Sequence, residues 1–140
     1  MGYKVLDPTK TFAEQVTAEN TIYEIRDVFD FGGTQANPVS VTIPTGVILK
    51  FNGGILKNCT INTNNSFIEA QDNQVFSNIN IVGMFRNDYL LAEWFAPITE
   101  LHEDGTFGSF FDATQDLQML LDSPNKNIKF GSHCFYITNT

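Results

Sequence analysis

Cysteine, tryptophan and basic residues are all scarce in this chain. Its 140 residues include two cysteines, one tryptophan and eight Lys or Arg against sixteen Asp or Glu, which gives a formal net charge of −8. The two thiols, Cys59 and Cys134, are too few for a disulfide scaffold or a zinc site. An acidic chain repels phosphate backbones, so we expect no nucleic-acid partner.

Long apolar runs are missing as well. No stretch approaches the ~20 apolar residues of a membrane span, so we expect no membrane partner. The start, MGYKVLDPTKTF, has no apolar signal-peptide core. What is present is a content of 42% hydrophobic and 13% aromatic residues, enough for a core. Asn and Gly separate short β-branched runs, which is typical of strands and turns and predicts an all-β fold.

An internal repeat of about twenty residues organises the middle of the chain. The segments 36–42, 56–62 and 76–82 align on this step, and residues 47–48 align with 67–68. An apolar–polar–apolar pattern recurs at the same phase, which indicates strands with one buried face. The two apolar columns are Val39, Cys59 and Ile79, then Val41, Ile61 and Ile81. The repeat predicts a short parallel β-solenoid of about three coils over 21–96, with an antiparallel sandwich as the alternative.

The two ends of the chain differ from this repeat. Residues 1–20 have no period and are expected to form an N-terminal arm that packs on a neighbouring chain. Apolar spacing over 111–127 predicts one capping α-helix, with Asp112 as N-cap and Ser123-Pro124 as its stop. The apolar positions of this helix are Ala113, Leu117, Leu120 and Leu121.

The C-terminal third resembles the start of pectin-lyase-like right-handed β-helices. The resemblance lies in Glu93-Trp94-Phe95-Ala96, Asp104-Gly105, the helix 112–121, Ile128-Lys129-Phe130, Gly131 and Tyr136-Ile137-Thr138. It departs from the family at 97–103, which replaces a shorter glycine-rich link. The resemblance implies that 97–140 is a loop, a cap helix and the first strand of a longer β-helix, so that the chain is a truncated piece of it.

The upstream part resembles the leader modules of long β-helical proteins of gut Bacteroides and their phages, including crAss-like phages. The order TIYEIR, DFGG, TIPTGVILKFNGG, LKNCTI and EWF over 21–96 carries this resemblance. It implies a structural virion component, the N-terminal anchoring part of a homotrimeric tail fibre or tailspike involved in host adsorption. Residues 1–20 would dock on other tail proteins, and a distal part would contact host surface polysaccharide.

Two alternatives stay open beside the virion tail. One is the N-terminal module of a β-helical polysaccharide lyase or hydrolase, at the bacterial cell surface or secreted. The other is a carbohydrate-binding module.

Candidate catalytic carboxylates are few. Glu100, Glu103 and Asp104 lie in a loop where solvated charge is the default, and the Asp112/Asp116 pair favours the helix dipole. A glycosidase needs two carboxylates facing each other across a groove, so we expect no enzymatic activity in this segment and no cofactor. His102 and His133 have no ligand spacing, so no metal is expected.

Aromatic residues supply the remaining candidate contacts. The adjacent Trp94 and Phe95 could form an exposed glycan or interface contact, or equally a lid on the end of the solenoid. Cys59 is expected to be a small core hydrophobe. A homotrimer is further predicted because the apolar residues exceed what one small column can bury. The residues expected to be exposed for that reason are Ile48, Phe76, Phe85, Phe110 and Phe111.

Overall fold

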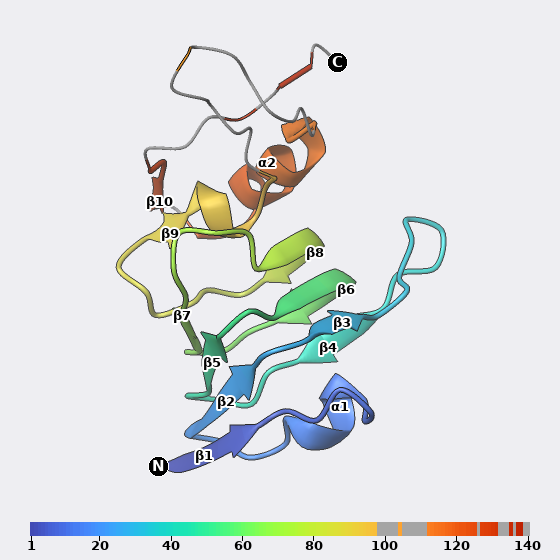
Figure 1. Ribbon diagram of the computed structural model, residues 1–140, viewed down its shortest axis with the longest axis vertical. Coiled ribbons are helices and arrows are strands. Elements are labelled where there is room, and N and C mark those ends of the chain that lie inside the picture. The colour runs from blue at the N-terminus through green and yellow to red at the C-terminus, as the bar shows by residue number, and fades with distance from the viewer. Residues whose placement is uncertain (98–103, 105–111, 126, 132–134, 136, 139–140) are drawn as a thin grey trace.

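The computed structural model describes residues 1–97, 104, 112–125, 127–131, 135, 137 and 138. Over these residues short strands dominate and helices are few, as the all-β prediction requires (Figure 1). The strands are β1 (Gly2–Val5), β2 (Thr21–Ile25), β3 (Val28–Asp30), β4 (Ser40–Thr42), β5 (Ile48–Phe51), β6 (Ile55–Asn62), β7 (Phe67–Glu69), β8 (Phe76–Val82), β9 (Leu90–Leu91) and β10 (Ile128–Lys129). The helices are α1 (Phe12–Gln15), the 3-10 turn η1 (Ala92–Trp94) and α2 (Thr114–Leu121).

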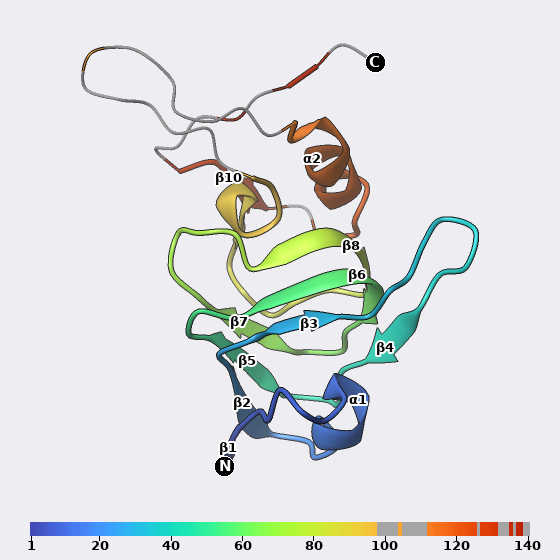
Figure 2. The same cartoon turned by 45° about the vertical axis from the view of Figure 1, so that its right-hand side comes forward.

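The strands form parallel sheets that rise along one direction of the molecule. One sheet has the order β1-β2-β5-β7, in a second β6 pairs with β3, β4 and β8, and β10 pairs with β9. Successive strands lie one above the other, with β1 at one end and α2 beyond β8 (Figures 1 and 2). Every strand pair among the described residues is parallel, so the antiparallel sandwich is wrong.

The predicted register is confirmed in one sheet and shifted by one residue in the other. Val41 pairs with Ile61 and Ile61 with Ile81, each twenty residues on. In the other sheet Phe67 pairs with Ile48, not with Val47 as predicted. The reason is the length of the corner: five residues (43–47) separate β4 from β5, but only four (63–66) separate β6 from β7.

Buried columns run through the stack. Tyr23, Leu49 and Ile68 pair in register and are all buried. An aromatic column adds to them: the Phe76 ring stacks on Phe95 at 4.7 Å and meets Phe51 edge-on at 5.2 Å between centroids. Such pairs stabilise beyond the area they bury. The expected exposure is wrong for two of the aromatic residues, because Phe76 and Phe85 are buried, whereas Ile48 is partly buried.

Val39 departs from the predicted inward column. Its neighbours in that column, Cys59 and Ile79, are buried, whereas Val39 is 36% exposed. It precedes the short edge strand β4, where its carbonyl still accepts the Thr60 amide at 2.7 Å. The backbone of Val39 is therefore aligned with β6 as predicted, but no part of the described chain covers its side chain.

Residues 1–20 form the first layer of the fold and not a free arm. β1 pairs with β2 from Gly2 opposite Thr21 to Val5 opposite Glu24. The α1 helix begins with a capping box in which the Thr11 side chain accepts the Glu14 amide and Glu14 accepts the Thr11 amide. Leu6, Phe12 and Val16 are buried within the same chain, whereas Met1, Tyr3 and Val5 are exposed. The segment therefore packs on its own chain and does not form the predicted arm.

A long excursion separates β3 from β4. Both strands pair with β6, and nine residues (31–39) lie between their paired positions where β6 has two (58 and 59). The excursion projects sideways from the stack (Figure 2). Gly33 is needed at its base, because a Cβ there would lie 2.6 Å from the Asn58 carbonyl oxygen.

The α2 helix covers β8. Ala113, Leu117 and Leu120 are buried as predicted, but Leu121 is 56% exposed. The buried face of α2 is therefore narrower than the spacing of its apolar residues indicated. The N-cap of the helix is Ala113 and not Asp112 as predicted, although Asp112 Oδ1 accepts the Thr114 backbone amide at 2.9 Å. Asn125 Oδ1 accepts the Phe85 amide at 3.0 Å.

No helix among the described residues is long and apolar enough to cross a membrane.

Candidate functional site

Four polar side chains form a ladder along one edge of the stack. Asn58 Nδ2 donates to Asp30 Oδ1 at 2.9 Å, and Asn78 Nδ2 donates to Asn58 Oδ1 at 2.9 Å. The backbone N–H of Asn78 donates to Asp116 Oδ1 at 3.1 Å. The ladder thus joins β3, β6 and β8 to α2, with a carboxylate at each end.

Asparagine suits the two inner positions of the ladder. Asn58 and Asn78 have φ of 63° and 54°, in the left-handed region. Asparagine tolerates this conformation better than other residues with a Cβ. Asn65, at the corner between β6 and β7, also has left-handed backbone, with φ of 56°.

The two terminal carboxylates have opposite electrostatics. A hydrogen bond from the Asn58 side-chain amide, followed by one from the Gly32 backbone amide, lowers the pKa of Asp30 below its usual value. Burial against β8 raises the pKa of Asp116, although the Asn78 amide opposes that rise; the Asp112 charge adds to it. The charged form of Asp116 is therefore destabilised by burial, whereas hydrogen bonds stabilise the charged form of Asp30.

A groove of about 370 Å³ lies over this ladder. Residues 33–39 of the excursion form one wall, α2 forms the other, and β6 and β8 form the floor. None of the described residues that line the groove carries a formal charge. Its polar lining consists of the side chains of Thr34, Gln35, Asn58, Thr60, Asn78, Asn80 and Gln115, and its apolar lining includes Pro38, Val39 and Met119.

Cys59 lies in the floor of the groove and behaves as the predicted core residue. It is 6% exposed and pairs with Ile79 in the adjacent strand. Burial raises the pKa of the thiol to about 12. The neutral thiol is therefore the form present at ordinary pH, and Cys59 is a poor nucleophile.

The structure does not place Trp94 and Phe95 on a surface. Trp94 is 5% exposed and Phe95 is 3% exposed. The Trp94 indole Nε1 donates to the Gln71 carbonyl oxygen at 2.7 Å, and the Phe95 ring stacks on Phe76. An exposed glycan or interface contact at these two rings is thus wrong, because their faces are already packed within the chain.

The candidate carboxylates do not converge on a described site. Asp104 is exposed. Asp112 accepts hydrogen bonds from the Thr114 amide and, at 3.0 Å, from the Thr138 hydroxyl. Asp116 instead accepts the Asn78 amide, so the two helix acids serve different partners. Other candidate residues lie outside the described residues: Glu100, His102, Glu103, Phe110, Phe111, His133 and Cys134. No group of three His, Cys, Asp or Glu within the described ranges could hold a metal ion.

No protein-family model matches this chain, and no curated protein or solved structure matches it. Sequence reasoning also missed the groove. The twenty-residue spacing of Asn58 and Asn78 was the signal available for its floor. The walls gave no such signal, because the excursion and α2 are brought together only by the folded chain.

Proposed function

We propose that this chain is a short right-handed parallel β-solenoid with one capping α-helix, and that it is the N-terminal, anchoring part of a phage tail fibre or tailspike. The recurring step of its strand pairing supports this proposal, since four strand pairs, β1 to β2, β5 to β7, β4 to β6 and β6 to β8, are nineteen or twenty residues apart. The steps from β2 to β5 and from β3 to β6 are 26 and 27 residues, because the excursion 31–39 lies within them. Chains that stack at a fixed step form elongated, quasi-one-dimensional bodies. Right-handed connections are the rule for parallel strands joined within one sheet.

In this proposal each part of the chain has a mechanical role in host adsorption. Residues 1–20 form the end layer that meets other tail proteins, and three copies associate as a homotrimer. The ladder and the aromatic column fix successive layers to one another, so that force on one layer reaches the next. Host surface polysaccharide is contacted by a more distal part of the particle.

Imaging of intact phage particles tests the virion location. An antibody raised against the purified 140-residue chain should label the tail in negative-stain images, and free chain should compete the label away. Label on the bacterial surface or in the culture fluid, with none on particles, would contradict a virion component. It would favour a secreted or cell-surface module.

A second candidate function is the binding of a neutral carbohydrate in the groove. The lining supports it, because side-chain amides and hydroxyls beside a small apolar surface suit sugar hydroxyls and ring faces. Titration of neutral oligosaccharides into isotopically labelled chain should shift the amide signals of Asn80 and Gln115. Gln115→Ala should weaken binding, whereas Asn64→Ala, outside the groove, should leave it unchanged. Shifts spread over the whole chain, or none at millimolar sugar, would contradict groove binding.

A further inference from the structure

The outer face of the sheet β1-β2-β5-β7 carries an apolar stripe that no layer of the described chain covers. Tyr3 pairs with Ile22, Ile22 with Ile48 and Ile48 with Phe67, so the four side chains share one face. Tyr3 is exposed and the other three are partly exposed. At a strand spacing of ~4.8 Å the stripe runs roughly 14 Å along the stacking direction.

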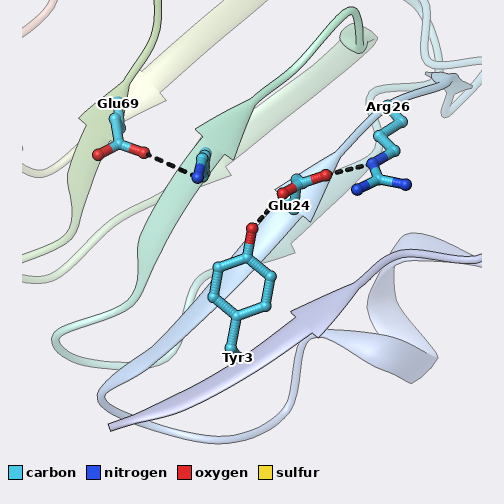
Figure 3. Close-up of polar contacts among 5 residues, drawn as sticks. Tyr3, Glu24, Arg26 and Glu69 are labelled. Carbon is cyan, nitrogen blue, oxygen red and sulfur yellow. Dashed lines mark hydrogen bonds and ion pairs between the residues drawn. The ribbon is translucent and has the colours of Figure 1, made fainter.

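A charged row runs beside the stripe on the same face. Glu24 pairs with Lys50 and Lys50 with Glu69, so acid, base and acid alternate up the sheet. Lys50 Nζ lies 3.9 Å from Glu69 Oε2, and Glu24 binds both the Tyr3 hydroxyl and Arg26 (Figure 3). The Tyr3 hydroxyl, followed by Arg26, lowers the pKa of Glu24, which keeps this buried carboxylate charged.

The charge on this face differs from that of the chain. Three of the eight basic residues gather there, namely Arg26, Lys50 and Arg86, whose guanidinium lies 5.1 Å from the centre of the Phe67 ring. Only Glu24 and Glu69 oppose them in the paired row. Two copies of a chain with a net charge of −8 repel one another over most of their surface. Where basic and acidic side chains lie beside one another, as on this face, that repulsion is weaker.

We propose that this face is the contact between copies of the chain, with the stripes of parallel copies meeting along the assembly axis. The inference rests on the homotrimer of the proposed function and names the face that forms it. A stripe parallel to the stacking direction meets its own counterpart at every layer when copies lie side by side around a cyclic axis. Each Lys50 then lies one strand from the exposed Glu69 carboxylate of the neighbour, whereas Glu24 stays buried against Tyr3 and Arg26.

Disulfide cross-linking of the full chain tests the face. With Cys134→Ser as background and Cys59 buried, Ile48→Cys adds one accessible thiol on the stripe. Mild oxidation should join the introduced thiols of two copies into a covalent dimer within the trimer. Val82→Cys, an exposed apolar position away from this sheet, should yield at least tenfold less dimer. Circular dichroism melts of both variants establish that each is folded.

Light scattering tests the homotrimer separately from the face that forms its contact. A trimer that cross-links at position 48 and not at position 82, and that dissociates with Ile48→Lys but not with Val82→Lys, is the expected result. A trimer without cross-linking at position 48 overturns this face and leaves the homotrimer intact. A monomer at high micromolar concentration overturns both the face and the homotrimer, while the virion location is still decided by imaging.

Discussion

The side-chain amide of Asn78 donates to the side-chain oxygen of Asn58 at 2.9 Å, across two strands that are twenty residues apart in the chain. Asn58 in turn donates to Asp30, so one residue holds together three layers. Both asparagines have left-handed backbone. Their side chains and their backbones are therefore required for different reasons, which substitutions can separate.

Asn58→Ala should lower the free energy of unfolding by about 2–3 kcal/mol. It removes two hydrogen bonds, each of roughly 1 kcal/mol, and places a Cβ without a polar side chain at positive φ. Asn58→Gly should lose only about 1–2 kcal/mol, since glycine accepts that φ. Urea denaturation measures both. Asn64→Ala, at an exposed site, should stay within about 0.5 kcal/mol of the parent; equal losses for alanine and glycine would argue against backbone strain.

Cys59→Asp should destabilise the chain by several kcal/mol, because it buries an unpaired carboxylate between apolar layers. Cys59→Val, a swap of similar volume, should be nearly neutral. Because burial raises the pKa of the thiol to about 12, Cys59 should react slowly with a thiol reagent at pH 8 until urea is added. Rapid labelling of the native chain, measured in a Cys134→Ser background, would be inconsistent with the register of β6 and β8.

Asp116→Asn should stabilise the chain at pH 7, by less than about 1 kcal/mol because the carboxyl keeps some contact with solvent. The pKa of Asp116 is raised, so its contribution to stability is fully present below the unfolded pKa and is lost as pH rises through the folded pKa. The gain from asparagine should thus vanish in acid. Asp112→Asn is the matched control in the same turn: Thr114 lowers the pKa of Asp112, so this change should destabilise at pH 7. Thermal melts from pH 3 to 7 compare the pair, and a gain for both variants would refute the difference between them.

Trp94 should report global unfolding. As the single tryptophan, buried and bonded through its indole to Gln71, it should emit at short wavelength and resist quenching by acrylamide in the native chain. Trp94→Phe removes that hydrogen bond and part of the packed volume, and should cost about 1–3 kcal/mol. Efficient quenching of native Trp94 would instead support the exposed aromatic pair that the structure contradicts.

Local pattern predicted those features that depend on neighbouring residues in the repeat. The alternation around Ile61 and Ile81 fixed both the strand and its buried face, and helical spacing located α2. The one-residue shift at Phe67 could not be predicted, because it depends on corner length, which left-handed residues such as Asn65 set without changing the apolar pattern. The burial of Glu24 could not be predicted either, because its main partner, Tyr3, lies in β1, a segment without a repeat pattern.

The length of the excursion between β3 and β4 can change without changing the rest of the fold. Because β6 holds the residues on both sides of it, the step of the stack is set by β6 and not by the connection. Adding residues to a loop whose ends are already fixed costs little free energy. Within the described chain, this wall of the groove is therefore where sequence can diverge or a foreign peptide can be grafted, while the paired layers on either side keep their spacing.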